Sequence, residues 1–176
     1  MNSIFLLKTL LIIMQVIFIG RFHLELSNIN GFIEPVSTIR KLTNPLVMPI
    51  KKLLPATVKK FSAIIIAYVT TFIVLIIFIP NVAVQNILIW ALIMFVGTWI
   101  SFLQYGMFLF VIGSWVQIPA LQRINYLLYG IFEPMLRPIQ RILPSFGGLD
   151  FSPIVFLLLL SVASSAFSQL VSRIFY

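Results

Sequence analysis

Long apolar runs separated by short basic segments constrain the fold of this chain more than any other feature. Four runs, at 3–22, 61–79, 95–116 and 153–175, are each close to the ~20 residues that an α-helix needs to cross a ~30 Å hydrocarbon core. Hydrophobic residues make up 61% of the chain and charged residues only 9%, a composition that excludes a soluble domain of this length. The sequence therefore predicts an all-α membrane protein with four transmembrane helices.

The region 84–116 is too long for one ordinary span and too short for two spans joined by a turn. Within it, Trp99 and Trp115 are about 24 Å apart along a helix that rises ~1.5 Å per residue. That separation suits aromatic anchors at the two faces of a bilayer. We therefore predict the third span at 95–116 and assign 84–94 to an interfacial or strongly tilted connection.

The first run carries Lys8 near its start, and the long side chain of a lysine can reach the bilayer surface. A lysine before an apolar run is also typical of a signal peptide, but the run ends in Gly20-Arg21-Phe22-His23, which lacks the small residues of a cleavage site. We therefore predict that this span is retained. His23 is interpreted as an interfacial polar residue, since a metal or haem ligand would need partner ligands.

A proline-rich segment at 133–154 is the least membrane-like part of the chain. Interior prolines remove a backbone donor and clash with the preceding turn, so we expect short helical pieces instead of one helix. Its mixture of apolar and basic residues suits the lipid headgroup layer. A Gly-Gly turn is expected next, and a serine cap followed by proline is expected to start the last span. The candidate interaction residues here are Pro134, Arg137, Pro138, Arg141, Pro144, Gly147, Gly148, Asp150, Ser152 and Pro153.

An earlier segment, 44–55, repeats this pattern in a simpler form. Its three prolines match those of 133–154 at one constant offset, and a lysine stands opposite Arg141. Chance would produce two matching prolines but not this whole register, which indicates an internal duplication. The matching residues, also candidates for interaction, are Pro45, Pro49, Lys52 and Pro55.

The duplication predicts two parallel repeats related by a pseudo-twofold axis along the membrane normal. Each repeat is expected to contain a helix, a broken interfacial proline-rich loop and a second helix. The chain then divides into a first repeat at 1–80, a connection at 81–94 and a second repeat at 95–176.

Basic residues indicate the orientation of these repeats. Lys and Arg number six in 24–60 and three in 117–152, whereas 80–86 has none. The positive-inside rule then places both proline-rich loops in the cytoplasm and both termini in the periplasm of a bacterial inner membrane.

The formal net charge of +8 suggests an anionic partner, either anionic lipids or nucleic acid. The charges lie between spans with few aromatic residues for base stacking, which favours anionic lipid headgroups over nucleic acid. We also expect an unidentified membrane or cytoplasmic protein partner, and the sequence leaves a homo-oligomer open. The chain has no cysteine, so thiolate chemistry is excluded.

The acidic side chains are few, and they argue against catalysis. They are Glu25, Glu34, Glu133 and Asp150. Only Glu133 and Asp150 would form a carboxylate pair, and neither histidine nor cysteine accompanies them, so we expect neither an enzyme nor a cofactor or metal. Glu133 is interpreted as a helix N-cap mirrored by Asn44. Asp150 is expected to pair with Arg137 or Arg141, or to lie at the positive end of the fourth helix, with proton or ion coupling as the alternative.

The second segment resembles the signature of the YggT family, whose bacterial members include YlmG and whose chloroplast relatives include a cytochrome b6f assembly factor. The resemblance covers nearly the whole chain, because the family uses a two-repeat form, although Met48 stands where the second segment has Arg137. It implies a multipass membrane protein linked to osmotic-stress tolerance, cell division or cofactor assembly. The matching pattern reads Pro134-x-Leu136-Arg137-Pro138-Ile139-x-Arg141-x-Leu143-Pro144, then Gly147-Gly148-x-Asp150-x-Ser152-Pro153.

Two functions of different classes follow. The first is a membrane scaffold or assembly factor that presents two basic interfacial loops to a partner or to anionic lipid. The second is a component of an ion or small-solute transport system, since parallel repeats with discontinuous helices also build transport sites. Transport usually needs ionisable or strongly polar residues deep in the membrane, whereas the predicted spans offer Gln104, serines and threonines. The scaffold is therefore favoured.

Overall fold

The computed structural model describes residues 3–27, 29–115, 118, 121–143 and 150–175. Within these residues the chain is helical and contains no β-strand, which confirms the prediction of an all-α protein. The elements are α1 (Ser3–Leu26), α2 (Val36–Leu53), a short 3-10 helix η1 (Lys59–Phe61), α3 (Ser62–Phe78), α4 (Val84–Trp115), α5 (Gln122–Gln140) and α6 (Ser152–Phe175).

Four of the helices are long and apolar enough to cross a membrane, as predicted. The candidate spans are Phe5–Leu26, Lys59–Phe78, Val84–Ser114 and Ser152–Ile174. The turn between the second and third spans contains Asn81 with φ 66°, a left-handed conformation that asparagine tolerates better than most residues.

The third span differs from the predicted one, because α4 is a single helix of 32 residues. Residues 84–94 form its first turns, so the helix begins eleven residues before the predicted start of the span at 95. No glycine or proline occurs between residues 84 and 94 to end the helix. At ~1.5 Å rise per residue α4 is about 48 Å long, so it must tilt or extend beyond a ~30 Å hydrocarbon core.

The two amphipathic helices also differ from expectation, because each continues through its prolines. Pro45 and Pro49 lie inside α2, and Pro134 and Pro138 lie inside α5. The prediction of broken helical pieces was therefore wrong at these four positions. The prolines are four residues apart within each helix and all four are exposed. Each proline leaves the carbonyl four residues earlier without its N–H donor.

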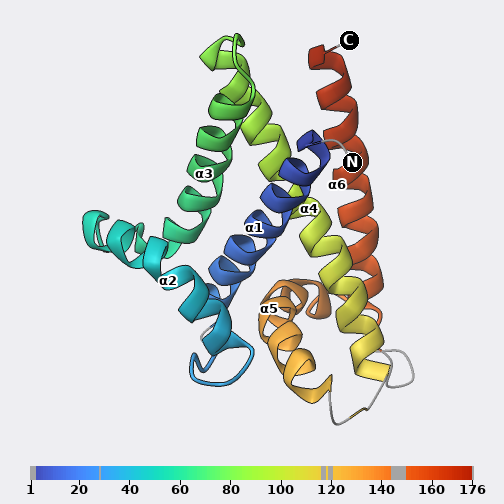
Figure 1. Ribbon diagram of the computed structural model, residues 1–176. Helices are drawn as coiled ribbons and strands as arrows, with labels where there is room; N and C mark the ends of the chain where they lie inside the picture. The colour runs from blue at the N-terminus through green and yellow to red at the C-terminus, as the bar shows by residue number, and fades with distance from the viewer. Residues whose placement is uncertain (1–2, 28, 116–117, 119–120, 144–149, 176) are drawn as a thin grey trace.

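The helices alternate in direction so that α2 and α5 lie at one end of the bundle and both chain termini mark the other end (Figure 1). α1 runs through the middle of the molecule and packs against α3 and α4, whereas α6 packs against α4 and α5. Of the candidate spans, α6 is the least covered by the rest of the protein. Only 6% of the residues in its apolar stretch are buried, against 39% for α1. One side of α6 is therefore left open.

Three hydrophobic clusters form the core, and α1 contributes to every one of them. The first joins α1 to α3 and α4 around Ile19 and Ala67, and it includes Val47 of α2. The second lies at the end of the bundle that holds α5 and includes the fully buried Phe132. The third lies near the other end around Leu11. Because the second cluster also contains residues of α1 and α2, the N-terminal and C-terminal halves share one core.

Candidate functional site

The candidate interaction residues of the N-terminal half lie on or beside α2. This helix has an exposed stripe of Lys41, Pro45 and Lys52, and Pro55 follows in the turn before η1. An adjacent exposed stripe is apolar and consists of Leu42, Leu46 and Leu53. A helix with a basic stripe beside an apolar one suits the boundary between headgroups and acyl chains.

The corresponding residues of the C-terminal half lie on α5 and around the start of α6. Those within α5 or directly after it are Pro134, Arg137, Pro138 and Arg141, all of them exposed. Those around the start of α6 are Asp150, Ser152 and Pro153. The predicted Gly-Gly turn and the third proline lie outside the described residues, at Pro144, Gly147 and Gly148, so these stay predictions.

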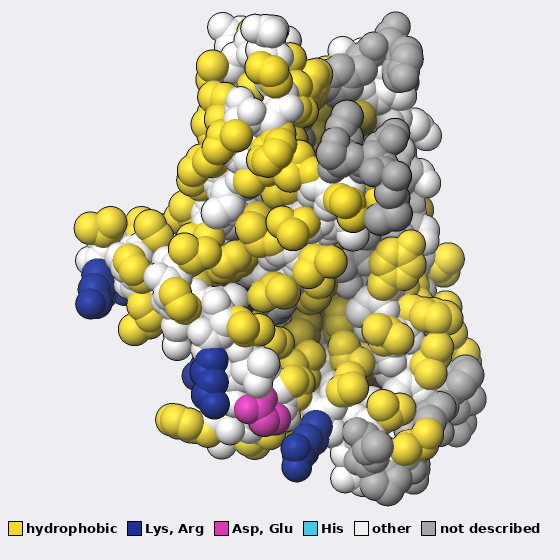
Figure 2. Space-filling model, viewed as in Figure 1, with side chains coloured by type: hydrophobic (Ala, Val, Ile, Leu, Met, Phe, Trp, Pro, Cys, Tyr) yellow, Lys and Arg dark blue, Asp and Glu magenta, His cyan; other side chains and the backbone are white. Residues whose placement is uncertain are grey.

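The basic side chains that are visible in Figure 2 lie toward the end of the molecule that holds α2, while hydrophobic side chains are spread over the whole visible face. On α5, Arg123, Arg137 and Arg141 share one stripe by helical periodicity, and all three are exposed. The two amphipathic helices therefore present cations at the same end of the bundle.

Glu133 and Asn44 are not helix caps, because both lie inside helices. Glu133 pairs with Arg137, with 3.6 Å between Oε1 and Nε, and the arginine side chain is 64% exposed. Such an exposed pair contributes ~0–1 kcal/mol to stability. Asn44 instead accepts a 3.3 Å hydrogen bond from Nη2 of Arg21. The interior prolines do not start new helices at these points, so Glu133 and Asn44 have no helix N-terminus to cap.

Asp150 acts on the start of α6, one of the two roles expected for it. Its Oδ1 accepts a 2.8 Å hydrogen bond from the backbone N–H of Ser152, and its Oδ2 accepts one of 2.9 Å from the Gln140 amide. Partial burial favours the neutral carboxyl, but the hydrogen bonds from Ser152 and Gln140 outweigh it, so the pKa of Asp150 is lowered. Asp150 forms no ion pair with Arg137 or Arg141 among the described residues.

Helix α6 begins at Ser152 as predicted, but the serine hydroxyl is not the cap. Ser152 Oγ is buried and has no hydrogen-bond partner among the described residues. Asp150, two residues earlier, supplies the capping oxygen instead.

A cluster of largely buried charges between α1 and α2 was not predicted from the sequence. Glu25 Oε1 lies 2.7 Å from Nε of Arg21 and 2.7 Å from Nζ of Lys51. The side chains are 5% exposed for Arg21, 10% for Glu25 and 25% for Lys51. The Glu25 carboxylate thus connects the last turns of α1 to the last turn of α2. The four-residue spacing of Arg21 and Glu25 was the available signal.

His23 lies in an aromatic environment that joins α1 to α4. Its Nε2 accepts a 3.0 Å hydrogen bond from the indole N–H of Trp99, and its ring stacks on Phe102 with 5.7 Å between centroids. His23 is 5% exposed, so it is a packed residue and not an interfacial one as expected. Among the described residues no group of three or more His, Cys, Asp or Glu is placed to hold a metal ion.

Two close approaches lock α5 into the bundle. A Cβ on Gly130 of α5 would lie 2.1 Å from Cδ1 of Ile29, in the segment between α1 and α2, and a Cβ on Gly106 of α4 would lie 2.6 Å from the ring of Phe132. Only glycine allows these contacts. The position of α5, and hence of its arginines, therefore depends on both halves of the chain.

The chain is similar to proteins of one family over nearly its whole length. Residues 89–171 match the family model described as CCB3/YggT. The uncharacterized protein YggT of Escherichia coli strain K12 is 32% identical, across 96% of this chain and 91% of its own length. An uncharacterized protein of Haemophilus influenzae is 31% identical over 73% of this chain and 71% of its own length. An uncharacterized protein of Vibrio alginolyticus is 29% identical over 100% of this chain and 99% of its own length. No solved structure matches the chain significantly.

Proposed function

This chain belongs to the CCB3/YggT family, and we propose that it is a multipass scaffold or assembly factor of the bacterial inner membrane. The names of its relatives state no activity, so the proposal rests on geometry. The observation that carries it is the placement of two proline-containing amphipathic helices, α2 and α5, at the same end of the bundle, each with an exposed basic stripe.

The two-repeat architecture is part of this proposal. Each half contains a long apolar helix, a proline-containing amphipathic helix and a second apolar helix. The second apolar helices begin in the same way: Ser62 opens α3 and Ser152 opens α6, both are buried, and neither hydroxyl has a partner among the described residues. This correspondence supports an origin by duplication, because two unrelated helices would not share an unusual buried hydroxyl at the first position.

The interfacial position of α2 and α5 follows from their prolines and charges. A carbonyl without a donor is costly in hydrocarbon, where no water is present, and tolerable among hydrated headgroups. The basic stripes are attracted to anionic headgroups by ~1 kcal/mol for each Lys or Arg near the surface. We therefore place both helices in the cytoplasmic headgroup layer, with the termini in the periplasm.

In this role the bundle holds two basic helices at the same end for a membrane or cytoplasmic protein partner and for anionic lipid. The buried Glu25 ties α2 to α1, and the contact of Gly130 with Ile29 holds α5. The resemblance to family members connected with osmotic-stress tolerance, cell division and cofactor assembly suits a protein that positions other membrane components.

The test neutralises the α5 stripe in the full-length protein with Arg137→Gln and Arg141→Gln. We expect weaker co-purification of the native partner and about a tenfold or greater loss of binding to anionic vesicles, since each charge contributes ~1 kcal/mol. Lysine at both positions should restore most of the binding because a point charge suffices. Arg173→Gln, at the opposite end of α6, is the matched control. Unchanged binding by the double glutamine variant would remove the basis of the proposal.

Transport is the competing function, and one observation favours it: a polar pair inside the spans. Gln15 of α1 donates a 2.8 Å hydrogen bond to Thr71 Oγ1 of α3, both residues are fully buried, and Gln15 Oε1 has no partner among the described residues. A solute path would use such groups. Ion or solute flux through liposomes that contain only the purified protein, abolished by Gln15→Leu, would replace the scaffold with a transporter.

A further inference from the structure

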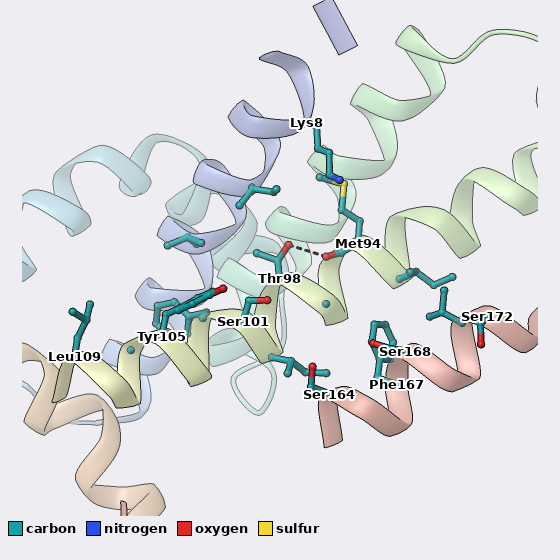
Figure 3. A pocket seen from close by; sticks show the side chains of 18 of the residues that line it. Lys8, Met94, Thr98, Ser101, Tyr105, Leu109, Ser164, Phe167, Ser168 and Ser172 are labelled. Carbon is teal, nitrogen blue, oxygen red and sulfur yellow. Dashed lines mark hydrogen bonds between the residues drawn. The ribbon is translucent and has the colours of Figure 1, made fainter. Parts of the chain in front are cut away.

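A groove runs between α1, α4 and α6 on the side that α6 leaves open (Figure 3). Its volume is about 1020 Å³, and its walls are mainly apolar, with Ile12, Val16, Ile93, Leu109, Phe167 and Val171 among them. Between Met94 and Leu109 the groove follows α4 for about 22 Å at ~1.5 Å rise per residue. That is long enough for an acyl chain, since one leaflet of a ~30 Å hydrocarbon core is ~15 Å thick.

One cation lies at the end of this groove near the chain termini. Lys8 of α1 points toward Met94 of α4 in Figure 3 and also borders two smaller hollows beside the end of α3. Lys8 makes no ion pair or hydrogen bond with any described residue. A charged side chain within a membrane span requires a counter-charge or contact with water.

The chain itself supplies no acidic side chain on this side of the bundle. Its four acidic residues lie at the end of α1, just before α2, inside α5 and just before α6, so all of them belong to the end that holds α2 and α5. Glu25 is 17 residues after Lys8, or about 26 Å along the axis of α1. No acidic side chain of the protein therefore neutralises Lys8, which leaves water or the anionic group of a ligand to satisfy its charge.

Hydroxyl groups accompany the lysine along the groove. Ser168 and Ser172 of α6 line it, as does Ser101 of α4. Ser172 donates to the carbonyl of Gln169, whereas Ser168 and Ser101 make no hydrogen bond with the described residues. The groove thus offers an apolar channel with a cation at one end and free hydroxyl donors on its walls.

We propose that this groove binds one anionic phospholipid from the leaflet opposite to α2 and α5, with its phosphate at Lys8 and an acyl chain along α4. The apolar walls suit the chain, the hydroxyls suit the glycerol esters, and Lys8 supplies the charge. This site is distinct from the basic stripes of α2 and α5 and does not depend on the proposed scaffold function.

A second copy of the protein would not satisfy Lys8 in the same way. A copy inserted in the same orientation places its acidic side chains at the end of α2 and α5, far from this lysine. A lipid of the nearer leaflet brings its phosphate to the required depth. Charge complementarity therefore selects a lipid over self-association at this groove.

The test measures lipids retained by the purified full-length protein with native mass spectrometry, after exposure to equal amounts of phosphatidylglycerol and phosphatidylcholine. We expect the wild type to retain one phosphatidylglycerol. Lys8→Gln should weaken this binding about fivefold, which corresponds to the ~1 kcal/mol expected for one Lys near an anionic group. Lys8→Arg should keep it. Arg173→Gln should also keep the binding. This variant removes a cation of α6 that lies at the same end of the bundle as Lys8 but outside the groove.

A second variant tests the groove without touching the charge. Ser168→Trp fills the groove from α6, an open face where the larger side chain is tolerated, and should prevent lipid retention with Lys8 still present. The proposal is overturned if Lys8→Gln behaves like Arg173→Gln, if Ser168→Trp retains the lipid as the wild type does, or if phosphatidylcholine is retained equally well.

Discussion

Trp99 and His23 join the two halves of the chain through one buried hydrogen bond. The indole N–H of Trp99 in α4 donates to Nε2 of His23 in α1 at 3.0 Å, and the rings lie edge to face with 5.8 Å between their centroids. The bond fixes the histidine as the neutral tautomer with its proton on Nδ1. His23 is therefore a buried structural acceptor in the last turn of α1.

Trp99→Phe should destabilise the protein, because it keeps an aromatic ring but leaves Nε2 of His23 buried without a donor. We expect a loss of ~1–3 kcal/mol, the cost of an unsatisfied buried polar group. Thermal unfolding in detergent, followed by near-ultraviolet circular dichroism, measures it. Trp90→Phe is the control, since Trp90 makes no side-chain hydrogen bond with the described residues. Equal melting temperatures for both variants would show that the His23 contact contributes little.

Glu25→Gln should be far more damaging than Glu133→Gln, although each glutamate pairs with an arginine four residues away. Removing the Glu25 charge leaves Arg21 and Lys51 facing each other in a buried site, a loss of ~3–5 kcal/mol for one partner of a buried pair. Removing the Glu133 charge affects an exposed pair worth ~0–1 kcal/mol. Chemical unfolding of both variants in the same detergent compares them. A similar effect for both would mean that water reaches the Glu25 cluster.

Gly130→Ala should destabilise the protein even though alanine favours helices by ~1 kcal/mol over glycine. Its Cβ would overlap Cδ1 of Ile29 at 2.1 Å, and overpacking of this kind costs ~1–3 kcal/mol. Ile29→Ala in the same chain should recover stability in a double-mutant cycle. Gly97→Ala is the control, because its Cβ meets Phe167 at an ordinary 3.5 Å. No rescue by the second substitution would place the strain elsewhere.

The contribution of Asp150 to stability should depend on pH with a defined sign. Because the folded protein lowers the pKa of this carboxyl, its contribution is complete above the ordinary value of ~3.9 and is lost as the pH falls through the lowered folded value. The stability difference between wild type and Asp150→Ala should therefore be constant near neutral pH and disappear in acid. Unfolding measured from neutral to acidic pH checks this, and a difference that grows in acid would contradict it.

Reporter fusions should place both amphipathic helices on one side of the membrane. A reporter after Lys60 and one after Leu143 should both be cytoplasmic, and one at Asn81 should be periplasmic, because the connection at 80–86 carries no basic residue. Accessible-cysteine labelling at the same sites provides an independent measurement. Opposite locations for the first two reporters would exclude parallel repeats.

The four spans were predictable because long apolar runs with few charges usually form membrane-spanning helices. The start of α4 was not predictable from tryptophan spacing, which indicates bilayer anchors and not helix ends. A glycine or proline before Phe95 would have ended the helix, and neither occurs there. The breaks were wrongly predicted because an interior proline can kink a helix without ending it, and Pro45, Pro49, Pro134 and Pro138 all lie inside helices at exposed positions. The roles of Glu25 and His23 depend on contacts with α2 and α4. A local sequence pattern does not predict such contacts between helices.

If α2 and α5 lie in the headgroup layer as proposed, their prolines help to set how deeply the protein sits in its bilayer. On each amphipathic helix, donor-free carbonyls resist entry into hydrocarbon, while on α2 the leucines at positions 42, 46 and 53 resist leaving it. The end with α2 and α5 is thereby held at a fixed level. A change in bilayer thickness must be absorbed at the other end, where α4 extends beyond the length of an ordinary span and can change its tilt. In the proposed orientation, the protein would respond to membrane thickness at one end only.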